Sequence, residues 1–150
     1  MNVAQRANEQ LASWPELTRV PSGCGSGSAL RAGDHDIVHF HSDRDADLHL
    51  TPGPIARLHA ELEQSTAVRL HPESPWVTVH LDCDSDADLL VALVSIALQA
   101  HANVPAGPAE PAPCNLARVE ILTSAQLAPA APVLRLHQGR RLHLPHRRTA

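Results

Sequence analysis

Aromatic residues and lysine are almost missing from this chain of 150 residues. It has two Trp, one Phe and no Tyr, and all of its basic side chains other than histidine are Arg. The core must therefore be built from Leu, Val, Ile and Ala, which the hydrophobic share of 43% allows. The length indicates one folded domain with room for a tail. We attach no function to the missing lysine.

Long apolar runs are also missing. The longest, Leu89–Leu98, is shorter than the ~20 residues that a membrane-spanning helix needs. The first residues, MNVAQRANEQLASW, are polar where a signal peptide requires an apolar stretch. We therefore expect a soluble, cytoplasmic protein with no membrane span.

Cysteine is scarce, and its spacing matches no short metal motif. Cys24, Cys83 and Cys114 form no C-x-x-C pair, and an odd number cannot pair completely within one chain. This pattern favours free thiols in a reducing compartment and excludes a zinc knuckle.

The net charge of −4 is unevenly distributed, with −8 on residues 1–104 and +4 on residues 105–150. An acidic body repels phosphate backbones, so we expect no nucleic acid binding by the core domain. The basic C-terminal residues are typical of a solvated tail. The sequence leaves a homo-oligomer open.

Alternating and helical patterns predict an α+β domain over residues 1–104: two layers, a mainly antiparallel sheet and helices packed on one face. Helices are predicted at 2–14, 51–65 and 86–101, and strands at 16–20, 28–33, 36–42, 46–51, 67–71 and 76–82. Ser85 and Asp88 suggest an S-x-x-D cap for the last helix. Residues 105–150 form a Pro/Ala/Arg-rich tail, poorly ordered or with a minor hairpin in 133–144. Truncation after Val104 should leave a soluble body with a melting temperature within a few degrees of the parent.

The segment HDIVHFHSDRDADLHLT, residues 35–51, is the most informative stretch. Its two alternating runs predict an antiparallel hairpin around Arg44, in which His39 faces His49 and His41 faces Asp47. Phe40 and Leu48 then lie on the core face.

The opposite face of the predicted sheet is polar, with His39, His41, Asp47, His49, Thr78 and His80 on adjacent strands. Imidazole and carboxylate groups at this spacing suit a transition metal or a general base. The alternative is an ordinary solvated face, because most surface histidines bind nothing and H-x-H alone is a weak motif. We assign no metal ligands, expect no tightly held metal, and identify no cofactor.

Other motifs explain less. The segment DCDSDAD lacks the central Gly and closing Glu of a calcium loop. Ser42, Ser74 and the thiols have no nucleophile-elbow context, so the sequence predicts no hydrolytic triad.

The order of these motifs resembles the luciferase-domain family, a group of small proteins named for similarity to fungal luciferase. The similarity covers about residues 15–101, and its most specific positions are His39, His41, Asp47, His71, Ser74 and Trp76. Val38 and Pro75 stand where the family pattern tends to have Gly.

The resemblance implies a compact α+β fold with a His/Asp-lined surface, and light emission is not implied. Our first hypothesis for this surface is a small-molecule-binding or oxygenase-like domain. On this hypothesis His39, His41 and Asp47 are catalytic, with a histidine as general base. The substrate would contact His49, His71, Trp76, Thr78 and His80. The alternative is a non-catalytic module that binds a metal or another protein through the same face.

Overall fold

A computed structural model describes residues 1–105 and 112–127, which contain one antiparallel sheet and five helices. The six strands lie in the order β1-β2-β3-β4-β6-β5. Their bounds are β1 Thr18–Pro21, β2 Ser28–Ala32, β3 His35–Phe40, β4 Asp45–Leu48, β5 Val68–Leu70 and β6 Val77–His80. The predicted α+β class is confirmed. The predicted hairpin at 133–144 lies outside the described residues.

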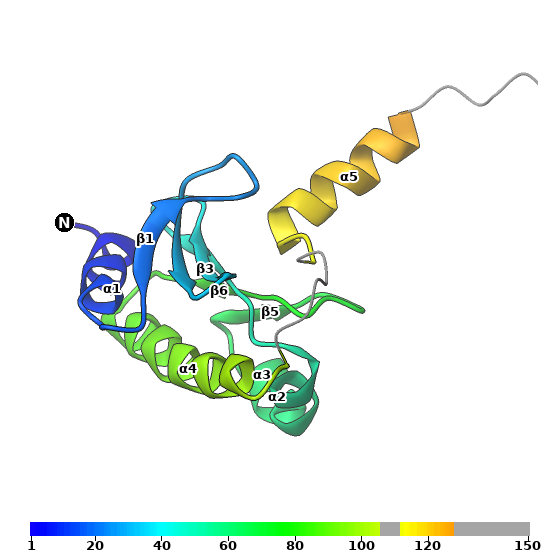
Figure 1. Ribbon diagram of the computed structural model, residues 1–150. Coiled ribbons are helices and arrows are strands. Elements are labelled where there is room, and N and C mark those ends of the chain that lie inside the picture. The colour runs from blue at the N-terminus through cyan, green and yellow to red at the C-terminus, as the bar shows by residue number, and fades with distance from the viewer. Residues whose placement is uncertain (106–111, 128–150) are drawn as a thin grey trace, which may run out of the picture.

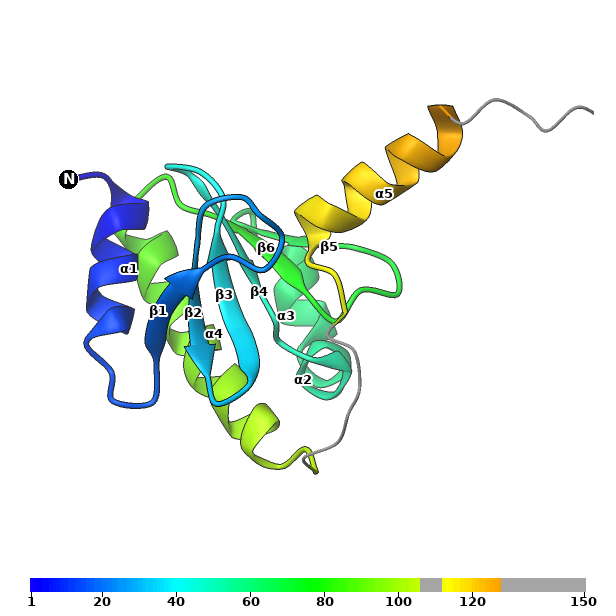
Figure 2. The same cartoon turned by 45° about the horizontal axis from the view of Figure 1, so that its top comes forward.

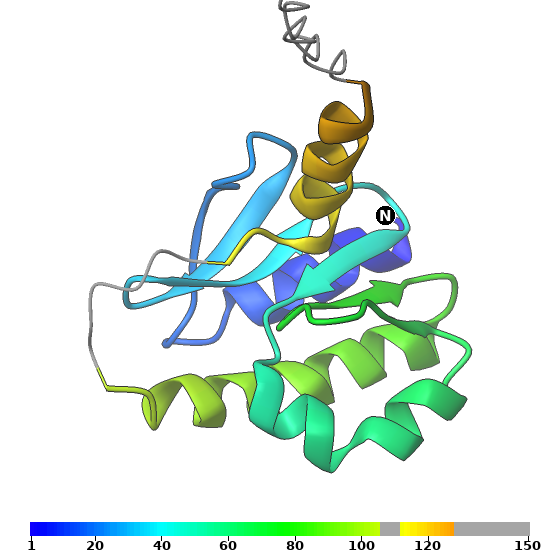
Figure 3. The ribbon, with the colours of Figure 1, turned by 90° about the vertical axis from the view of Figure 1, so that its right-hand side faces the viewer.

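Four helices cover one face of the sheet, and the fifth begins on the opposite face (Figures 1, 2 and 3). The covering helices are α1 Val3–Ala12, α2 Pro52–Arg57, α3 His59–Gln64 and α4 Asp84–Ala102. The fifth, α5 Asn115–Leu127, starts against the strands and extends away from the body (Figure 3). The first turn of α5 is therefore the helical part that approaches the polar face.

The core forms where α1 and α4 pack on the strands. The predicted inward residues Val77, Val79 and Leu81 are buried, as are Phe40 and Leu48. By length and hydropathy α4 is also able to cross a membrane. In this fold it lies across the sheet, and its core contacts are Leu90, Leu93, Val94 and Ala97.

The predicted helix at 51–65 is two helices. Leu58 leaves helical geometry at φ −103° and ψ 15°, and the chain bends there. Because α2 contacts α4 whereas α3 contacts β5, the bend lets one apolar stripe pack against two different elements.

The predicted cap of α4 is wrong by two residues. Cys83 is the N-cap residue, and the Asp86 carboxylate accepts hydrogen bonds from the backbone N–H groups of Cys83 (3.0 Å) and Asp82 (2.9 Å). Because acidic residues alternate in DCDSDAD, both Cys83 with Asp86 and Ser85 with Asp88 have the spacing of an N-cap residue and its partner. β6 ends at His80, so the helix can begin at the first of these two positions.

The predicted hairpin register is also wrong by two residues. His39 pairs with Asp47, Phe40 with Ala46 and Val38 with Leu48, so His39 and His49 are not opposite each other. A slip of two residues keeps every side chain on its predicted face, and the hydrophobic pattern cannot distinguish the two registers.

Candidate metal centre

The polar face of the sheet is covered, although a solvated face was the expected alternative. His39 is 4% exposed and Asp47 is 2% exposed. Trp76 lies beside His39, with ring centroids 4.8 Å apart, and residues 112–118 close over the strands from the other side. The two polar side chains are therefore in an environment of low polarity, where hydrogen bonds and charges act strongly.

Hydrogen bonds attach residues 112–118 to the sheet, and the Asn115 side chain makes three of them. Its side-chain oxygen accepts from the Ser74 hydroxyl (2.6 Å), and its amide nitrogen donates to the Trp76 carbonyl (3.2 Å) and the Thr78 hydroxyl (3.1 Å). The Trp76 indole donates to the Ala112 carbonyl (3.1 Å). Ser74 and Trp76, singled out by the family resemblance, thus position the start of α5.

Four potential metal ligands converge beneath this cover. Their donor atoms, the Cys24 and Cys114 sulfurs and one ring nitrogen each of His39 and His41, lie within 4.8 Å of one another. We call these four residues the Cys/His cluster. The H-x-H motif at the end of β3 supplies the histidines, His39 on the strand and His41 directly after it. The cysteines come from the β1–β2 loop and the residue before α5, so no local spacing revealed them.

Each histidine of the cluster has a carboxylate partner on one ring nitrogen. His39 Nε2 lies 2.9 Å from Asp36 Oδ2, and His41 Nε2 lies 3.2 Å from Asp47 Oδ2. The opposite nitrogen of His41, Nδ1, lies 3.9 Å from Cys24 Sγ and 3.3 Å from the Ser26 carbonyl oxygen, and Nδ1 of His39 lies 3.5 Å from the Ser22 hydroxyl. In a neutral ring that keeps its proton on Nε2 toward the carboxylate, Nδ1 would carry the lone pair that a metal ligand needs.

The carboxylates are held in their ionised form. Burial alone raises the pKa of Asp47, but hydrogen bonds from His41, the Thr78 hydroxyl and the Leu116 N–H outweigh it and lower the pKa. The same balance lowers the pKa of Asp36, where Arg31 and His39 are the donors. Both carboxylates therefore act as fixed hydrogen-bond acceptors for the imidazoles.

The cluster itself favours positive charge on nitrogen and negative charge on sulfur. Burial lowers the pKa of His41, but its hydrogen bonds to Asp47 and Cys114 raise it to about 10. Burial raises the pKa of Cys114, but hydrogen bonds from His39, His41 and the Ala117 N–H lower it to about 6. A metal cation would take the place of the protons on the ring nitrogens and pair with the thiolate sulfur, so its binding would release protons.

The remaining predicted site residues lie on two sides of the cluster. On one side, His49 stacks on Trp76, with centroids 4.6 Å apart and ring planes 10° apart. On the other, His71 lies 3.3 Å from the Thr78 hydroxyl and His80 contacts Asp45. Thr78 joins this group to the cluster because its hydroxyl donates to Asp47 (2.6 Å).

Two small cavities border the cluster. One, of about 270 Å³, is lined by Cys24, His39, Cys114, His49 and Trp76 among others. The second, of about 310 Å³, is lined by His41, Asp47, His71, Thr78 and His80 among others. The predicted substrate residues thus line two cavities: His49 and Trp76 line the first, and His71, Thr78 and His80 line the second.

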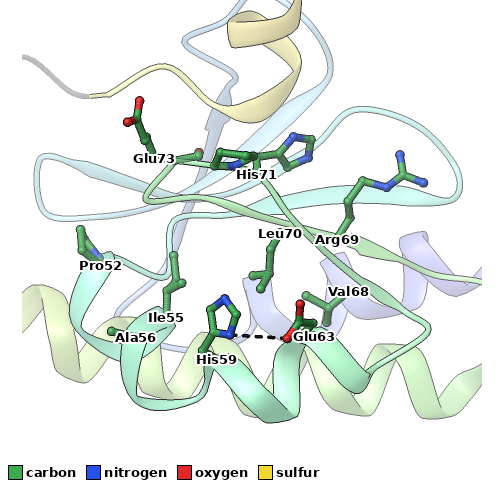
Figure 4. A pocket seen from close by; sticks show the side chains of 12 residues that line it. Pro52, Ile55, Ala56, His59, Glu63, Val68, Arg69, Leu70, His71 and Glu73 are labelled. Carbon is green, nitrogen blue, oxygen red and sulfur yellow. Dashed lines mark ion pairs between the residues drawn. The ribbon is translucent and has the colours of Figure 1, made fainter.

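A larger cleft of about 720 Å³ lies away from the cluster, between α2–α3 and β5 (Figure 4). Ile55, Val68 and Leu70 line it, and His59 and Glu63 form an ion pair of 3.8 Å beside them (Figure 4). Its lining has apolar surface but none of the four cluster residues, so its size alone does not make it the chemical centre.

Comparisons with known proteins give one match. A family model described as Luciferase domain matches residues 34–97, which contain His39, His41, Asp47 and Trp76. Cys24 and Cys114 lie outside the matched residues. Searches of curated proteins and of solved structures returned no match.

Proposed function

We propose that this chain, whose residues 34–97 belong to the luciferase-domain family, binds one zinc-like metal ion through Cys24, His39, His41 and Cys114. The proposal replaces our sequence-based expectation of no tightly held metal. The sequence analysis selected the same two histidines, but it expected one of them to act as a general base beside Asp47. In the proposed centre they are ligands, and Asp47 orients one of them.

The opposed orientation of the two imidazoles is the observation that carries the proposal. In both rings Nε2 faces a carboxylate; His41 Nδ1 lies 3.9 Å from Cys24 Sγ, and His39 Nδ1 lies 3.5 Å from the Ser22 hydroxyl, which itself contacts Cys24 Sγ (2.7 Å). Carboxylate–histidine–metal arrangements of this kind fix the tautomer and increase the basicity of the ligand nitrogen. Two solvated histidines would not be expected to share this orientation, because water can satisfy their ring nitrogens in any direction.

The donor set favours zinc over calcium or magnesium. Two thiolates and two imidazoles are borderline-to-soft ligands, whereas calcium and magnesium prefer oxygen. Tetrahedral zinc with such ligands requires donor atoms roughly 3.3–3.8 Å apart. The donors lie within 4.8 Å, so inward movements of roughly 1 Å or less would complete the tetrahedron.

Metal analysis of the purified protein tests this proposal. We expect one zinc per chain by mass spectrometry, and a cobalt-substituted protein with the visible bands of tetrahedral thiolate coordination. Cys114→Ser, and the double variant His39→Ala with His41→Ala, should each lose the metal. Cys83→Ser is the matched control, because Cys83 is an exposed thiol outside the cluster. Equal metal content in all four proteins would contradict the proposal.

A second candidate function is binding of a small molecule beside the metal. The cavity of about 270 Å³ supports it, because three cluster residues share its wall with Trp76 and His49. This volume is slightly below the ~300–1,000 Å³ of typical ligand sites and suits a compact molecule. The observation does not distinguish catalysis from simple binding.

Filling the cavity tests the second candidate. Ala117 lines it from α5, so Ala117→Leu should block ligand binding and leave the metal content unchanged. A thermal-shift screen of small molecules against the zinc-loaded protein provides ligands for this comparison. A ligand that stabilises parent and Ala117→Leu equally would not occupy this cavity.

A further inference from the structure

We propose that Cys24 and Cys114 are an oxidation site, at which a hydroperoxide converts the two metal-binding thiolates into a disulfide and releases the metal. This inference rests on the proposed metal centre and adds its regulation. The chemical class of the reactant is a hydroperoxide, with hydrogen peroxide as its simplest member.

The positions of the two sulfurs support this site. Their sulfur atoms lie within 4.8 Å of each other, whereas a disulfide needs about 2.05 Å. Cys24 is on the β1–β2 loop next to Gly25, where an added Cβ would meet nothing within 4 Å. Open space lies beside Cys24 at this position, and Cys24 is not held on a strand of the sheet, so the Cys24 side can make the required approach.

Access distinguishes the roles of the two sulfurs. Cys24 is half-buried, Cys114 is buried, and both line the cavity of about 270 Å³. Cys24 is therefore the sulfur that a peroxide reaches more readily. Metal-bound sulfur is already deprotonated, which is the form that reacts with peroxides.

The reaction balances in two steps. The Cys24 thiolate attacks one peroxide oxygen, so an S–O bond forms, the O–O bond breaks and hydroxide leaves. The Cys114 thiolate then attacks the Cys24 sulfur, so the S–S bond forms, the S–O bond breaks and a second hydroxide leaves. The two sulfurs lose two electrons, hydrogen peroxide gains them, and the divalent ion departs because its thiolate ligands are gone.

The disulfide would have a structural consequence. It would join the β1–β2 loop to the residue before α5, which is the connection that the metal otherwise makes. Residues 112–118 would thus stay on the sheet in the metal-bound and oxidised states. In the reduced, metal-free state, only their hydrogen bonds and packing would hold them.

The test uses the full chain with Cys83→Ser, which leaves two thiols. Serine is a favourable N-cap residue, so this change should preserve the start of α4. Trypsin cleaves after arginine and places Cys24 in residues 20–31 and Cys114 in residues 70–118. A thiol at position 83 would fall in the second peptide, and its removal makes the linkage unambiguous.

Zinc-loaded protein is treated with one equivalent of hydrogen peroxide, and released zinc is measured with a chromogenic chelator. We expect one zinc released per disulfide, peptides 20–31 and 70–118 joined in the unreduced digest, and recovery of zinc binding after dithiothreitol. Zinc release with unlinked or over-oxidised peptides, or a disulfide between two chains, would overturn the inference.

A metal-free arm separates this inference from the proposed function. If the parent binds no zinc and the reduced chain still forms the Cys24–Cys114 linkage, the metal centre fails but the two sulfurs are a reactive pair; the coupled switch is then overturned. If zinc binds and the linkage does not form, the metal centre stands and the oxidation site fails. Cys24→Ser in the same background should give no linked peptide.

Discussion

Individual side chains on the outer sheet face differ in their roles according to their partners. His39 and His41 face thiols on one nitrogen and carboxylates on the other, whereas His49 is stacked on Trp76 and lies near other histidines. Burial, followed by the nearby His101 and His35, lowers the pKa of His49 to about 4. The pKa of His41 is raised and that of His49 is lowered, so the two groups change the stability in opposite directions as the pH falls.

His49 should make the protein less stable in mild acid. Its folded-state pKa of about 4 lies below the ordinary value of 6.5, so the unfolded chain binds more protons between these values. Stability should therefore increase as pH rises from 4 to 6.5 and reach its full value above 6.5. The contribution is roughly 3 kcal/mol from a difference of about 2.5 pKa units.

His49→Phe tests this expectation because phenylalanine keeps an aromatic ring against Trp76. Urea unfolding of metal-free protein at several pH values should show a shallower pH dependence in the variant, with the remaining slope from other groups such as His101. Equal slopes in parent and variant would assign the acid sensitivity elsewhere.

Asp47 should control metal affinity through His41. Asp47→Asn removes the negative charge that accepts from His41, Thr78 and Leu116. We expect zinc affinity to fall by about 10–100-fold, as for other partners of metal-bound histidines. The metal-free protein should also lose about 1–3 kcal/mol of stability, because a buried group loses a matched partner.

Competition with a zinc chelator measures the affinity, and Asp45→Asn on the same strand is the control. The Asp45 side chain contacts His80 and Ser42, and its backbone carbonyl accepts from the His41 N–H (3.2 Å), a bond that asparagine can keep. A similar loss of affinity in both variants would point to general electrostatics and not to the orientation of His41.

At the scale of single elements, the β1–β2 loop and the first turn of α5 determine whether the cluster forms. The loop supplies Cys24, and its Gly27 has φ +74°. A Cβ at Gly27 would lie 2.0 Å from the Phe40 carbonyl oxygen, which belongs to β3. The close approach of loop and strand therefore requires glycine.

Gly27→Ala should destabilise the protein more than Gly25→Ala. Gly25 also has positive φ, +78°, but an added Cβ there meets nothing within 4 Å. Gly25→Ala should cost only the strain of the left-handed conformation, roughly 1–2 kcal/mol. Gly27→Ala adds a backbone clash and should also weaken zinc binding by displacing the loop. Urea unfolding and metal titration of both variants would show this difference, and equal losses would contradict it.

At the scale of the whole molecule, the body and the segment at its C-terminal side have separable tasks. The hydrophobic core is formed by residues of α1, the strands, α3 and α4, and the described part of α5 adds none to it. Cys114 and the hydrogen bonds of Asn115 instead complete the outer face. Folding of the body and assembly of the metal centre should therefore be separable by truncation.

Truncation after Val104 should leave a body that unfolds cooperatively but has lost zinc binding. It removes Cys114 and uncovers the face around Trp76. Truncation after Leu127 is the control, because it keeps the described part of α5 and all four cluster residues. Calorimetry of both chains in chelator, with zinc titration of each, makes the comparison. Loss of cooperative unfolding only in the shorter chain would show that the segment is part of the folding unit.

The sequence by itself determined the class of fold, the assignment of side chains to faces and the family resemblance. Alternation in DIVHFHS and ADLHLT places Phe40 and Leu48 inside and His39 and Asp47 on the other face, because side chains on a strand alternate. This local rule does not depend on distant residues. The same motifs carried the family resemblance that the match to residues 34–97 confirms.

Only the tertiary structure decided the register, the burial of the polar face and the composition of the cluster. A slip of two residues changes the partners of His39 without moving any side chain to another face, so the pattern could not detect it. Cys24 and Cys114 lie far apart in the chain and share no motif. They meet because the β1–β2 loop and the start of α5 converge on β3, and long-range convergence of this kind leaves no periodic signal in the sequence.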